Sequence, residues 1–199
     1  MNKFVLLLLL LFAPMAYANP LVLFETTEGQ FAVELFDDKV HATVQNFMTY
    51  VRSGYYNGTL FHRIVSNAQY SVVQGGGYTK FDREGIIEKP GLRSPIVLEA
   101  RSDLSNQQYT LAMARQETPN SATAQFFING RDNATQFDGN YAVFGKLLTG
   151  CSGCEKLIDQ LLEKPIKPIR FVQFGKEAVE AKNVPVVPIR IISAKILQD

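Results

Sequence analysis

The sequence predicts a mainly β protein, a closed eight-stranded antiparallel barrel capped by two short α-helices. Some eight short apolar runs alternate with polar residues and are separated by loops rich in Gly, Pro, Asn and Asp. Only two segments have the spacing of an amphipathic helix, and strands and helices do not alternate as they do around a parallel sheet. Closing such a sheet into a barrel removes the edges that it would otherwise expose.

The first eighteen residues have the pattern of a secretory signal peptide. Lys3 gives a weakly basic start, Phe4 to Phe12 is an unbroken apolar run, and Ala16-Tyr17-Ala18 is a small-x-small triplet. A membrane-spanning helix needs about 20 apolar residues, roughly twice this run. We therefore predict cleavage after Ala18, a single domain over residues 19–199, and export to an oxidising compartment.

Composition excludes several classes of partner. The chain has 199 residues, 46% of them hydrophobic, which is enough to build a core. It carries 20 Lys and Arg against 19 Asp and Glu, and removal of Lys3 with the leader leaves 19 of each. A chain of zero net charge has no general attraction for nucleic acid or for an anionic membrane. We expect neither as a partner of the mature protein.

The mature chain begins with a hairpin and a helix. Leu21–Phe24 and Gln30–Phe36 are strand-like runs joined by a short turn that contains Gly29. A short amphipathic helix over roughly Thr43 to Ser53 is then predicted by apolar residues spaced by three and four. These apolar residues are Val44, Phe47, Met48 and Val51.

Further strand-like runs and a second short helix complete the chain. The strand-like runs are Thr59–Val65, Tyr70–Gln74, Ile96–Ala100, Tyr109–Ala114, Ala124–Asn129, Tyr141–Leu148 and Val186–Leu197. The apolar spacing between Leu157 and Leu162 predicts the helix, which ends at Lys164-Pro165. We expect Glu163–Val184 to be a long packed loop, with an added strand or lobe, or a partner surface, as the alternatives.

Three blocks of sequence carry the chemistry: Phe61-His62-Arg63-Ile64, Val73-Gln74-Gly75-Gly76-Gly77 and Gln125-Phe126-Phe127-Ile128. With these blocks in this order, the chain resembles the cyclophilins, the cyclosporin-type peptidyl-prolyl cis–trans isomerases. The resemblance covers about Leu21 to Leu197 and, with the leader, is strongest to the periplasmic cyclophilins of Gram-negative bacteria. It implies a monomeric periplasmic isomerase that acts on proline-containing polypeptides and helps exported proteins fold, with no cofactor and no metal.

The chemistry of the X–Pro bond explains these residue types. Rotation about this tertiary amide has a barrier of about 18–20 kcal/mol. In the twisted state conjugation is lost and the proline nitrogen regains its lone pair. A hydrogen-bond donor aimed at that nitrogen stabilises the twisted state more than either planar state. The resemblance gives this role to Arg63, whose guanidinium stays charged, and gives Gln74 the tasks of positioning Arg63 and binding the substrate backbone.

The resemblance also implies a hydrophobic pocket for the proline ring. Phe127 forms its floor, and Val72, Phe137 and Tyr141 form its walls. Ordinary core packing is the alternative for such residues, and we prefer it for Phe126, which alternates to the opposite face of its strand.

Three further positions match contacts of the family with the substrate backbone. They are Gln125 and the backbone around Ala114 and Arg115. Arg115 replaces a common Asn, but hydrogen bonds of the backbone survive a change of side chain.

The chain departs from the family between Arg63 and Gln74, where the interval is about three residues longer than usual. Ser66–Ser71 replaces the usual Pro-Gly-Phe. Counting back from Gln74 places Ser71 at the pocket Phe of the family, whereas a small bulge would place Tyr70 there.

His62 and the two cysteines have structural interpretations. Strand alternation sends His62 opposite to Arg63, so we expect a structural, hydrogen-bonded histidine. Cys151 and Cys154 form a CxxC motif, for which a local disulfide is the first interpretation. A zinc site would need a second pair of ligands, and a thioredoxin-like enzyme would need a βαβ architecture.

Two other functions compete with the isomerase. The altered loop before Gln74 motivates a proline-peptide-binding module or holding chaperone with weak catalysis. The CxxC motif motivates a thiol–disulfide enzyme. Arg63, Gln74 and Phe127 together favour the isomerase, because binding alone does not need an arginine aimed at the proline nitrogen.

Overall fold

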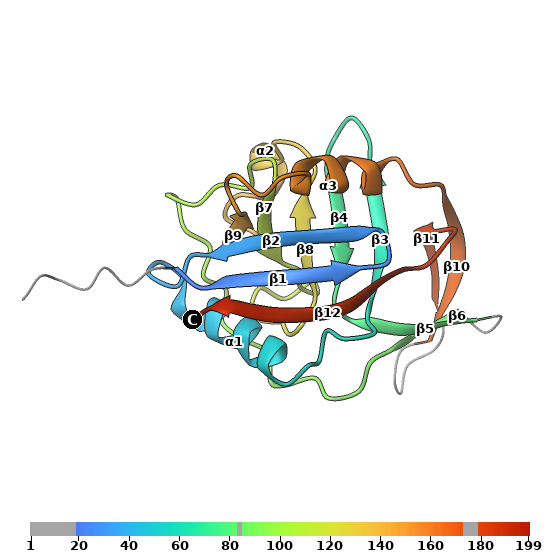
Figure 1. Ribbon diagram of the computed structural model, residues 1–199, viewed down its shortest axis with the longest axis horizontal. Helices are drawn as coiled ribbons and strands as arrows, with labels where there is room; N and C mark the ends of the chain where they lie inside the picture. Colours follow the sequence, from blue (N-terminus) through green and yellow to red (C-terminus); the bar gives the residue numbers. More distant parts are fainter. Residues whose placement is uncertain (1–18, 83–84, 173–178) are drawn as a thin grey trace, which may run out of the picture.

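The computed structural model describes residues 19–82, 85–172 and 179–199. Within these residues, eight strands close a barrel in the order β1-β12-β3-β4-β8-β7-β9-β2, and every neighbouring pair is antiparallel (Figure 1). The predicted closed eight-stranded antiparallel barrel is confirmed. Its strands are β1 (Leu21–Thr26), β2 (Gly29–Leu35), β3 (Leu60–Ser66), β4 (Ser71–Gly75), β7 (Thr110–Met113), β8 (Phe126–Asn129), β9 (Val143–Leu147) and β12 (Ile189–Gln198).

The predicted hairpin forms between β1 and β2. Residues of β1 alternate between partly exposed and buried positions, and Val22 and Phe24 point into the barrel. Phe24 pairs across the hairpin with Phe31, and their rings stack with centroids 4.9 Å apart. Strand β1 also pairs with β12, so the first and the last strand of the described residues lie side by side and close the sheet (Figure 1).

Two helices cap the barrel, as predicted, and pack against one core. These are α1 (His41–Arg52) and α3 (Cys154–Leu162), which lie at opposite edges of the barrel in Figure 1. The ring of Phe47 in α1 meets those of Phe126 and Phe144, at 5.6 and 4.9 Å between centroids. A third helix, α2 (Ala134–Phe137), is too short for apolar periodicity to reveal it.

The predicted strand at Ile96–Ala100 is wrong. Ile96 makes only an isolated bridge to Ala122, and the amide of Leu98 donates to the side chain of Asn120. Glu99 caps α1 instead, because its carboxylate accepts from both the amide and the hydroxyl of Thr43 at 2.6 Å. This segment is therefore a loop. The amide of Leu98 binds the side chain of Asn120, and the carboxylate of Glu99 binds the first turn of α1.

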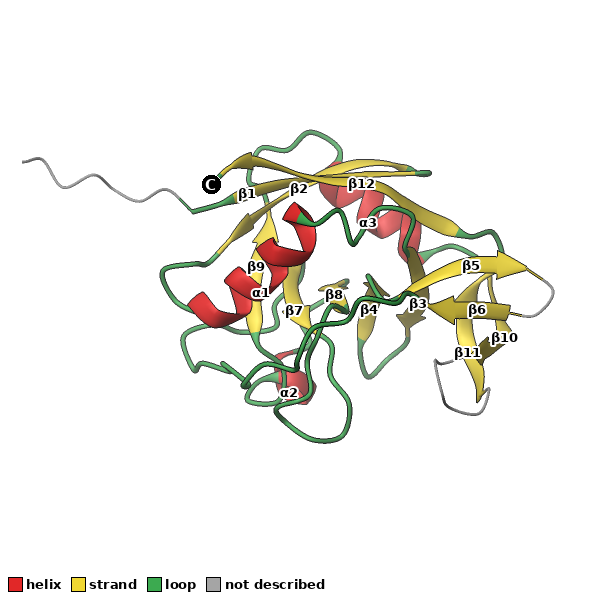
Figure 2. Ribbon diagram, turned by 90° about the horizontal axis from the view of Figure 1, so that it is seen from below, coloured by secondary structure: helices red, strands yellow, loops and turns green. Residues whose placement is uncertain are grey.

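The expectation of a packed loop at Glu163–Val184 is also wrong, and the alternative of added strands is correct. The described part of this region forms β10 (Ile166–Val172) and β11 (Val179–Pro185), while β5 (Tyr78–Asp82) and β6 (Gly85–Glu88) follow β4. Together they make a second sheet in the order β11-β10-β6-β5, which projects from one end of the barrel (Figure 2). A small separate core holds it against β3: Leu60, Tyr78, Ile86 and Val184.

The predicted disulfide is confirmed, since Cys151 and Cys154 are bonded at the start of α3. The sulfur of Cys154 is buried against β2, where it accepts a hydrogen bond from the amide of Ala32 at 3.4 Å. Cys154 therefore holds the start of α3 against β2, and the disulfide joins it to Cys151 in the preceding turn.

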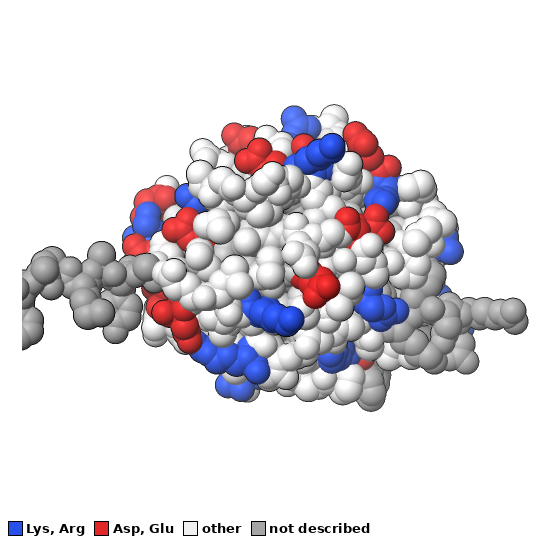
Figure 3. All heavy atoms as spheres, in the orientation of Figure 1, with Lys and Arg blue, Asp and Glu red and all other residues white. Residues whose placement is uncertain are grey.

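The surface of the described residues is of mixed charge. In Figure 3, which views the face formed by β1, β2 and β12, basic and acidic side chains are interspersed. Among these residues, no helix is long and apolar enough to cross a membrane.

The packing of Phe47 gives a stability prediction. Replacing Phe47 with Ala removes a ring that fills the space between Phe126 and Phe144, and we expect the free energy of unfolding to fall by about 3–5 kcal/mol. Phe47→Leu keeps most of the volume and should cost clearly less. Urea unfolding of the three proteins measures both values. A loss below about 1 kcal/mol for Phe47→Ala would contradict this account of the core.

Candidate active site

Pairing of β3 with β4 brings the two predicted catalytic residues together. Arg63 lies directly opposite Gln74 in the ladder, and its Nη1 donates a hydrogen bond to Gln74 Oε1 at 3.1 Å. Both side chains are partly exposed on the outside of the barrel. The guanidinium is therefore held by the sheet while some of its N–H groups remain available.

The contact continues across the next strand to Gln125. Gln74 Nε2 donates to Gln125 Oε1 at 3.0 Å, which makes a line of three polar side chains. The glycines after β4 allow this approach. A Cβ atom on Gly77 would lie 2.4 Å from Cγ of Gln125, and Gly76 has φ +85°, in the left-handed region. The triple glycine is thus part of what places Gln125 beside Gln74.

A hollow of about 150 Å³ opens beside the guanidinium. It contains eight of the nine site residues that the sequence predicts: Arg63, Val72, Gln74, Ala114, Arg115, Phe127, Phe137 and Tyr141. The ninth, Gln125, lies in the adjoining hollow described below. The structure thus brings together residues from several separate segments, and their roles in catalysis and binding stay predictions.

Aromatic rings line the hollow and set its shape. Phe127 is 4% exposed, and its ring meets those of Phe137 and Tyr141 edge to face at 5.5 and 5.4 Å. Phe127 belongs to an apolar layer outside the barrel, whereas its neighbour Phe126 is fully buried in the main core. The preference for core packing at Phe126 is therefore confirmed, and alternation along β8 separates the site from the barrel interior.

The side chain of Arg115 has a structural role at the hollow. Its Nε donates to the carbonyl of Asn140 at 2.7 Å, and its guanidinium carbon lies 5.0 Å from the centre of the Tyr141 ring. The arginine therefore fixes the turn that carries Tyr141. Sequence reasoning missed this role, although the replacement of the usual Asn was a signal for it.

Tyr70, and not Ser71, stands beside the hollow. Ser71 is buried, and its amide donates to Asn133 Oδ1 at 3.1 Å. The ring of Tyr70 packs on Phe137 with centroids 5.3 Å apart, and its hydroxyl accepts from Nη2 of Arg63 at 2.9 Å. Tyr70 is thus the nearer of the two candidates, but neither Tyr70 nor Ser71 lines the hollow.

His62 is a buried neutral residue behind the site. Its side chain is 3% exposed and lies edge-on to Tyr78, with centroids 4.6 Å apart. Burial lowers its pKa to about 3, helped by the charge of Arg63 and opposed by hydrogen bonds to the backbone of Leu60 and the side chain of Gln125. The structural role is confirmed. Simple strand alternation did not predict the contact between His62 and Gln125. The register of β3 shifts between Phe61 and Arg63, and such a shift interrupts the alternation at His62.

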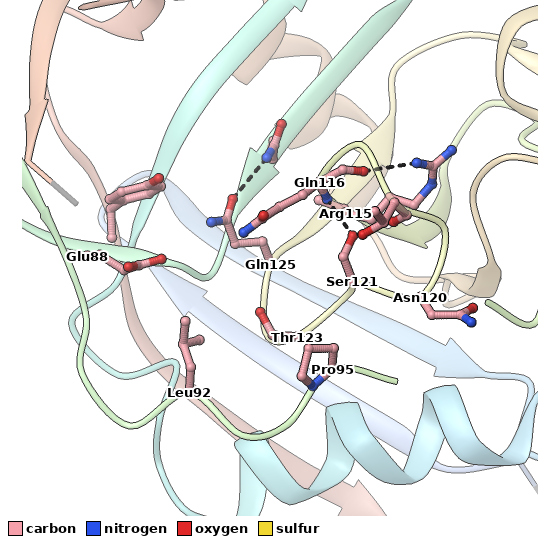
Figure 4. A pocket seen from close by; sticks show the side chains of 13 residues that line it. Glu88, Leu92, Pro95, Arg115, Gln116, Asn120, Ser121, Thr123 and Gln125 are labelled. Atoms are coloured by element: carbon pink, nitrogen blue, oxygen red, sulfur yellow. Dashed lines mark hydrogen bonds between the residues drawn. The ribbon is translucent and has the colours of Figure 1, made fainter. Parts of the chain in front are cut away.

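A second, larger hollow of about 490 Å³ (Figure 4) adjoins the first. Glu88, Leu92 and Pro95 lie on one side of it, and Thr123 and Gln125 on the other. The two hollows share Gln74, Ala114 and Arg115. The two hollows therefore meet at these three residues on the surface of the protein. In the described parts of the chain, no three His, Cys, Asp or Glu side chains gather as a metal ion would need.

A barrel of this topology, with an arginine beside an aromatic hollow on its outer wall, defines a prolyl isomerase of the cyclophilin type. The family model for the cyclophilin type peptidyl-prolyl cis-trans isomerases matches residues 21–195. The chain therefore belongs to this family and is a peptidyl-prolyl cis–trans isomerase. The sequence-based assignment is confirmed.

Relatives support the assignment over most of the chain. A peptidyl-prolyl cis-trans isomerase of Acinetobacter baylyi is 37% identical, covering 94% of this chain and 90% of the relative. Peptidyl-prolyl cis-trans isomerase A of Dickeya dadantii is 38% identical, covering 89% and 84%. A crystal structure of a cyclophilin type isomerase of Cryptosporidium parvum has a TM-score of 0.68 at 23% identity, covering 91% of this chain and 99% of that one.

The lowered pKa of His62 predicts that stability depends on pH. In the unfolded chain a histidine has a pKa near 6.5, and in the folded protein that of His62 is about 3. Between these values the unfolded chain binds more protons, so the free energy of unfolding falls as pH falls, by up to about 1.4 kcal/mol per pH unit. Above pH 6.5 His62 should add no slope. Urea unfolding at pH 7.5, 5.5 and 4.5 measures how the free energy of unfolding changes with pH.

The control separates His62 from the rest of the chain. We expect His62→Gln to flatten the slope below pH 6.5, whereas His41→Gln, at the exposed second histidine, should retain it. An unchanged slope in His62→Gln would contradict the prediction.

Proposed function

We propose that this cyclophilin accelerates X–Pro isomerisation in extended segments of exported proteins, and that Arg63 donates the hydrogen bond that lowers the barrier. The observation that carries the proposal is the guanidinium of Arg63, held by Gln74 at 3.1 Å on the rim of the aromatic hollow.

Catalysis in this site needs no bond to form between protein and substrate. The proline ring enters the hollow over Phe127, between Phe137 and Tyr141, so that the imide nitrogen faces Arg63. As the imide twists, the lone pair develops on that nitrogen and accepts from the guanidinium. The donor is already in place before the twist, so little reorganisation is needed at the top of the barrier.

The substrate is held largely through its backbone. Gln74 and Gln125 supply side-chain amides at the second hollow, and Ala114 lines both hollows. Backbone contacts accept many residues before proline. A crystal structure of the Cryptosporidium parvum relative was determined in the presence of the dipeptide Ala-Pro, which supports a proline-containing peptide as the ligand class here.

Export is supported by the leader and by the disulfide. Residues 1–18 have the three-part signal pattern and lie outside the described residues. The bond between Cys151 and Cys154 suits an oxidising compartment such as the periplasm. We propose that the mature protein works there as a monomer on newly exported chains.

Removing the guanidinium tests the catalytic role. We expect Arg63→Ala to lower kcat/KM about 100-fold or more, because the twisted state loses its charged donor. The measurement is chymotrypsin-coupled isomerisation of an Ala-Pro-Phe peptide. Arg52→Ala is a matched control, since Arg52 pairs only with exposed Asp199 in the contacts described, and it should keep the wild-type rate.

Two outcomes would point to the competing functions. A wild-type rate equal to that of buffer would favour the proline-peptide-binding module or holding chaperone. A large loss in the double variant Cys151→Ser/Cys154→Ser, with little loss in Arg63→Ala, would favour thiol chemistry.

Processing of the full chain tests export. Expressed in a Gram-negative host, the protein should be recovered from the periplasmic extract with Asn19 as its first residue, as measured by intact mass. Ala18→Arg should block cleavage, because the cleavage site requires a small residue. Recovery of the unprocessed chain from the cytoplasm would contradict the proposal.

A further inference from the structure

The catalytic arginine has a second anchor. Its Nη1 donates to Gln74 Oε1 at 3.1 Å, and its Nη2 donates to the hydroxyl of Tyr70 at 2.9 Å. A guanidinium is planar, so acceptors at both terminal nitrogens fix the orientation of the whole plane. With Gln74 as the only acceptor, the guanidinium plane could rotate about the single hydrogen bond between Nη1 and Gln74 Oε1.

The loop that carries Tyr70 is itself held in place. Oδ1 of Asn67 accepts from the amides of Gln69 and Tyr70, at 2.9 and 3.0 Å, which makes a tight turn. Nη1 of Arg131 donates to the carbonyls of Asn67 and Ala68, at 3.1 and 3.2 Å. These contacts define one conformation for the extra residues between β3 and β4.

The ring of Tyr70 is positioned by the wall of the hollow. It packs on Phe137 at 5.3 Å and lies in the outer apolar layer with Val72 and Phe127. Tyr70 is not among the residues that line the hollow. Its hydroxyl therefore touches the arginine and stays away from the ring of the substrate.

We propose that Tyr70 is a positioning residue for catalysis, whose hydroxyl sets the plane of the Arg63 guanidinium against the imide nitrogen. The proposal rests on the proposed role of Arg63. A donor must be held within about 0.5 Å and 10–20° of its working geometry to favour the twisted state. The three-residue extension of the loop thus supplies an anchor that the sequence pattern does not reveal.

Tyr70→Phe tests the hydroxyl alone, because the ring and its packing on Phe137 remain. We expect kcat to fall about fivefold while KM stays within about twofold, since the hydroxyl acts on the twisted state through Arg63. Exchange NMR at saturating peptide separates the two constants. Tyr109→Phe is the matched control: it removes a hydroxyl bonded to Asp159 of α3 and should leave both constants unchanged.

A double-mutant cycle shows whether the hydroxyl acts through the arginine. In an Arg63→Ala background, Tyr70→Phe should cause no further loss. An equal loss in both backgrounds, or no loss of kcat in the wild-type background, would overturn the proposal. If instead Arg63→Ala is as active as the wild type, the proposed role of Arg63 fails, which is a separate and distinguishable result.

A readout without turnover completes the test. Nitrogen-15 relaxation of the Arg63 guanidinium reports how tightly the group is held. We expect a lower order parameter in Tyr70→Phe than in the wild type and no change in Tyr109→Phe. An unchanged order parameter in Tyr70→Phe would overturn the proposal even if the activity of Arg63→Ala is too low to complete the cycle.

Discussion

The site depends on one cross-strand pair, Arg63 opposite Gln74. The ladder between β3 and β4 sets this pairing, and a slip of one residue would turn each side chain to the other face. A register shift between Phe61 and Arg63 keeps Phe61 in the core while Arg63 faces the hollow. The position of Arg63 on the outer wall therefore depends on the packing of Phe61 inside the barrel.

Strands and helices whose apolar residues repeat at a regular spacing could be predicted from the sequence. Alternation gave the β1–β2 hairpin, and apolar spacing gave α1 and α3. The second sheet was missed because β6 has four residues, begins at Gly85 and pairs in parallel with β10, which lies far along the chain. Ile96–Ala100 had the composition of a strand, but Leu98 and Glu99 use their polar groups to bind a loop and a helix. These partners lie far away in the sequence, so a pattern read over a few residues cannot reveal them.

The candidate site was predictable in its residues but only partly in its contacts. Family motifs placed Arg63, Gln74 and Phe127, and the fold gathers them around one hollow. The hydrogen bonds of Tyr70 and Arg115 depend on loop conformations that propensity does not determine. Tyr70 contacts both Arg63 and the ring of Phe137, and Arg115 contacts the ring of Tyr141. Both residues lie where this sequence differs from the usual cyclophilin pattern.

The separation of the two aromatic layers has a consequence for access. Phe126 and its neighbours fill the barrel, so a ligand has no route through the middle, and the hollow over Phe127 opens sideways. A polypeptide bound as we propose would therefore dock at an internal proline without threading a free end through the barrel. Both flanking segments of that polypeptide would remain outside the hollow.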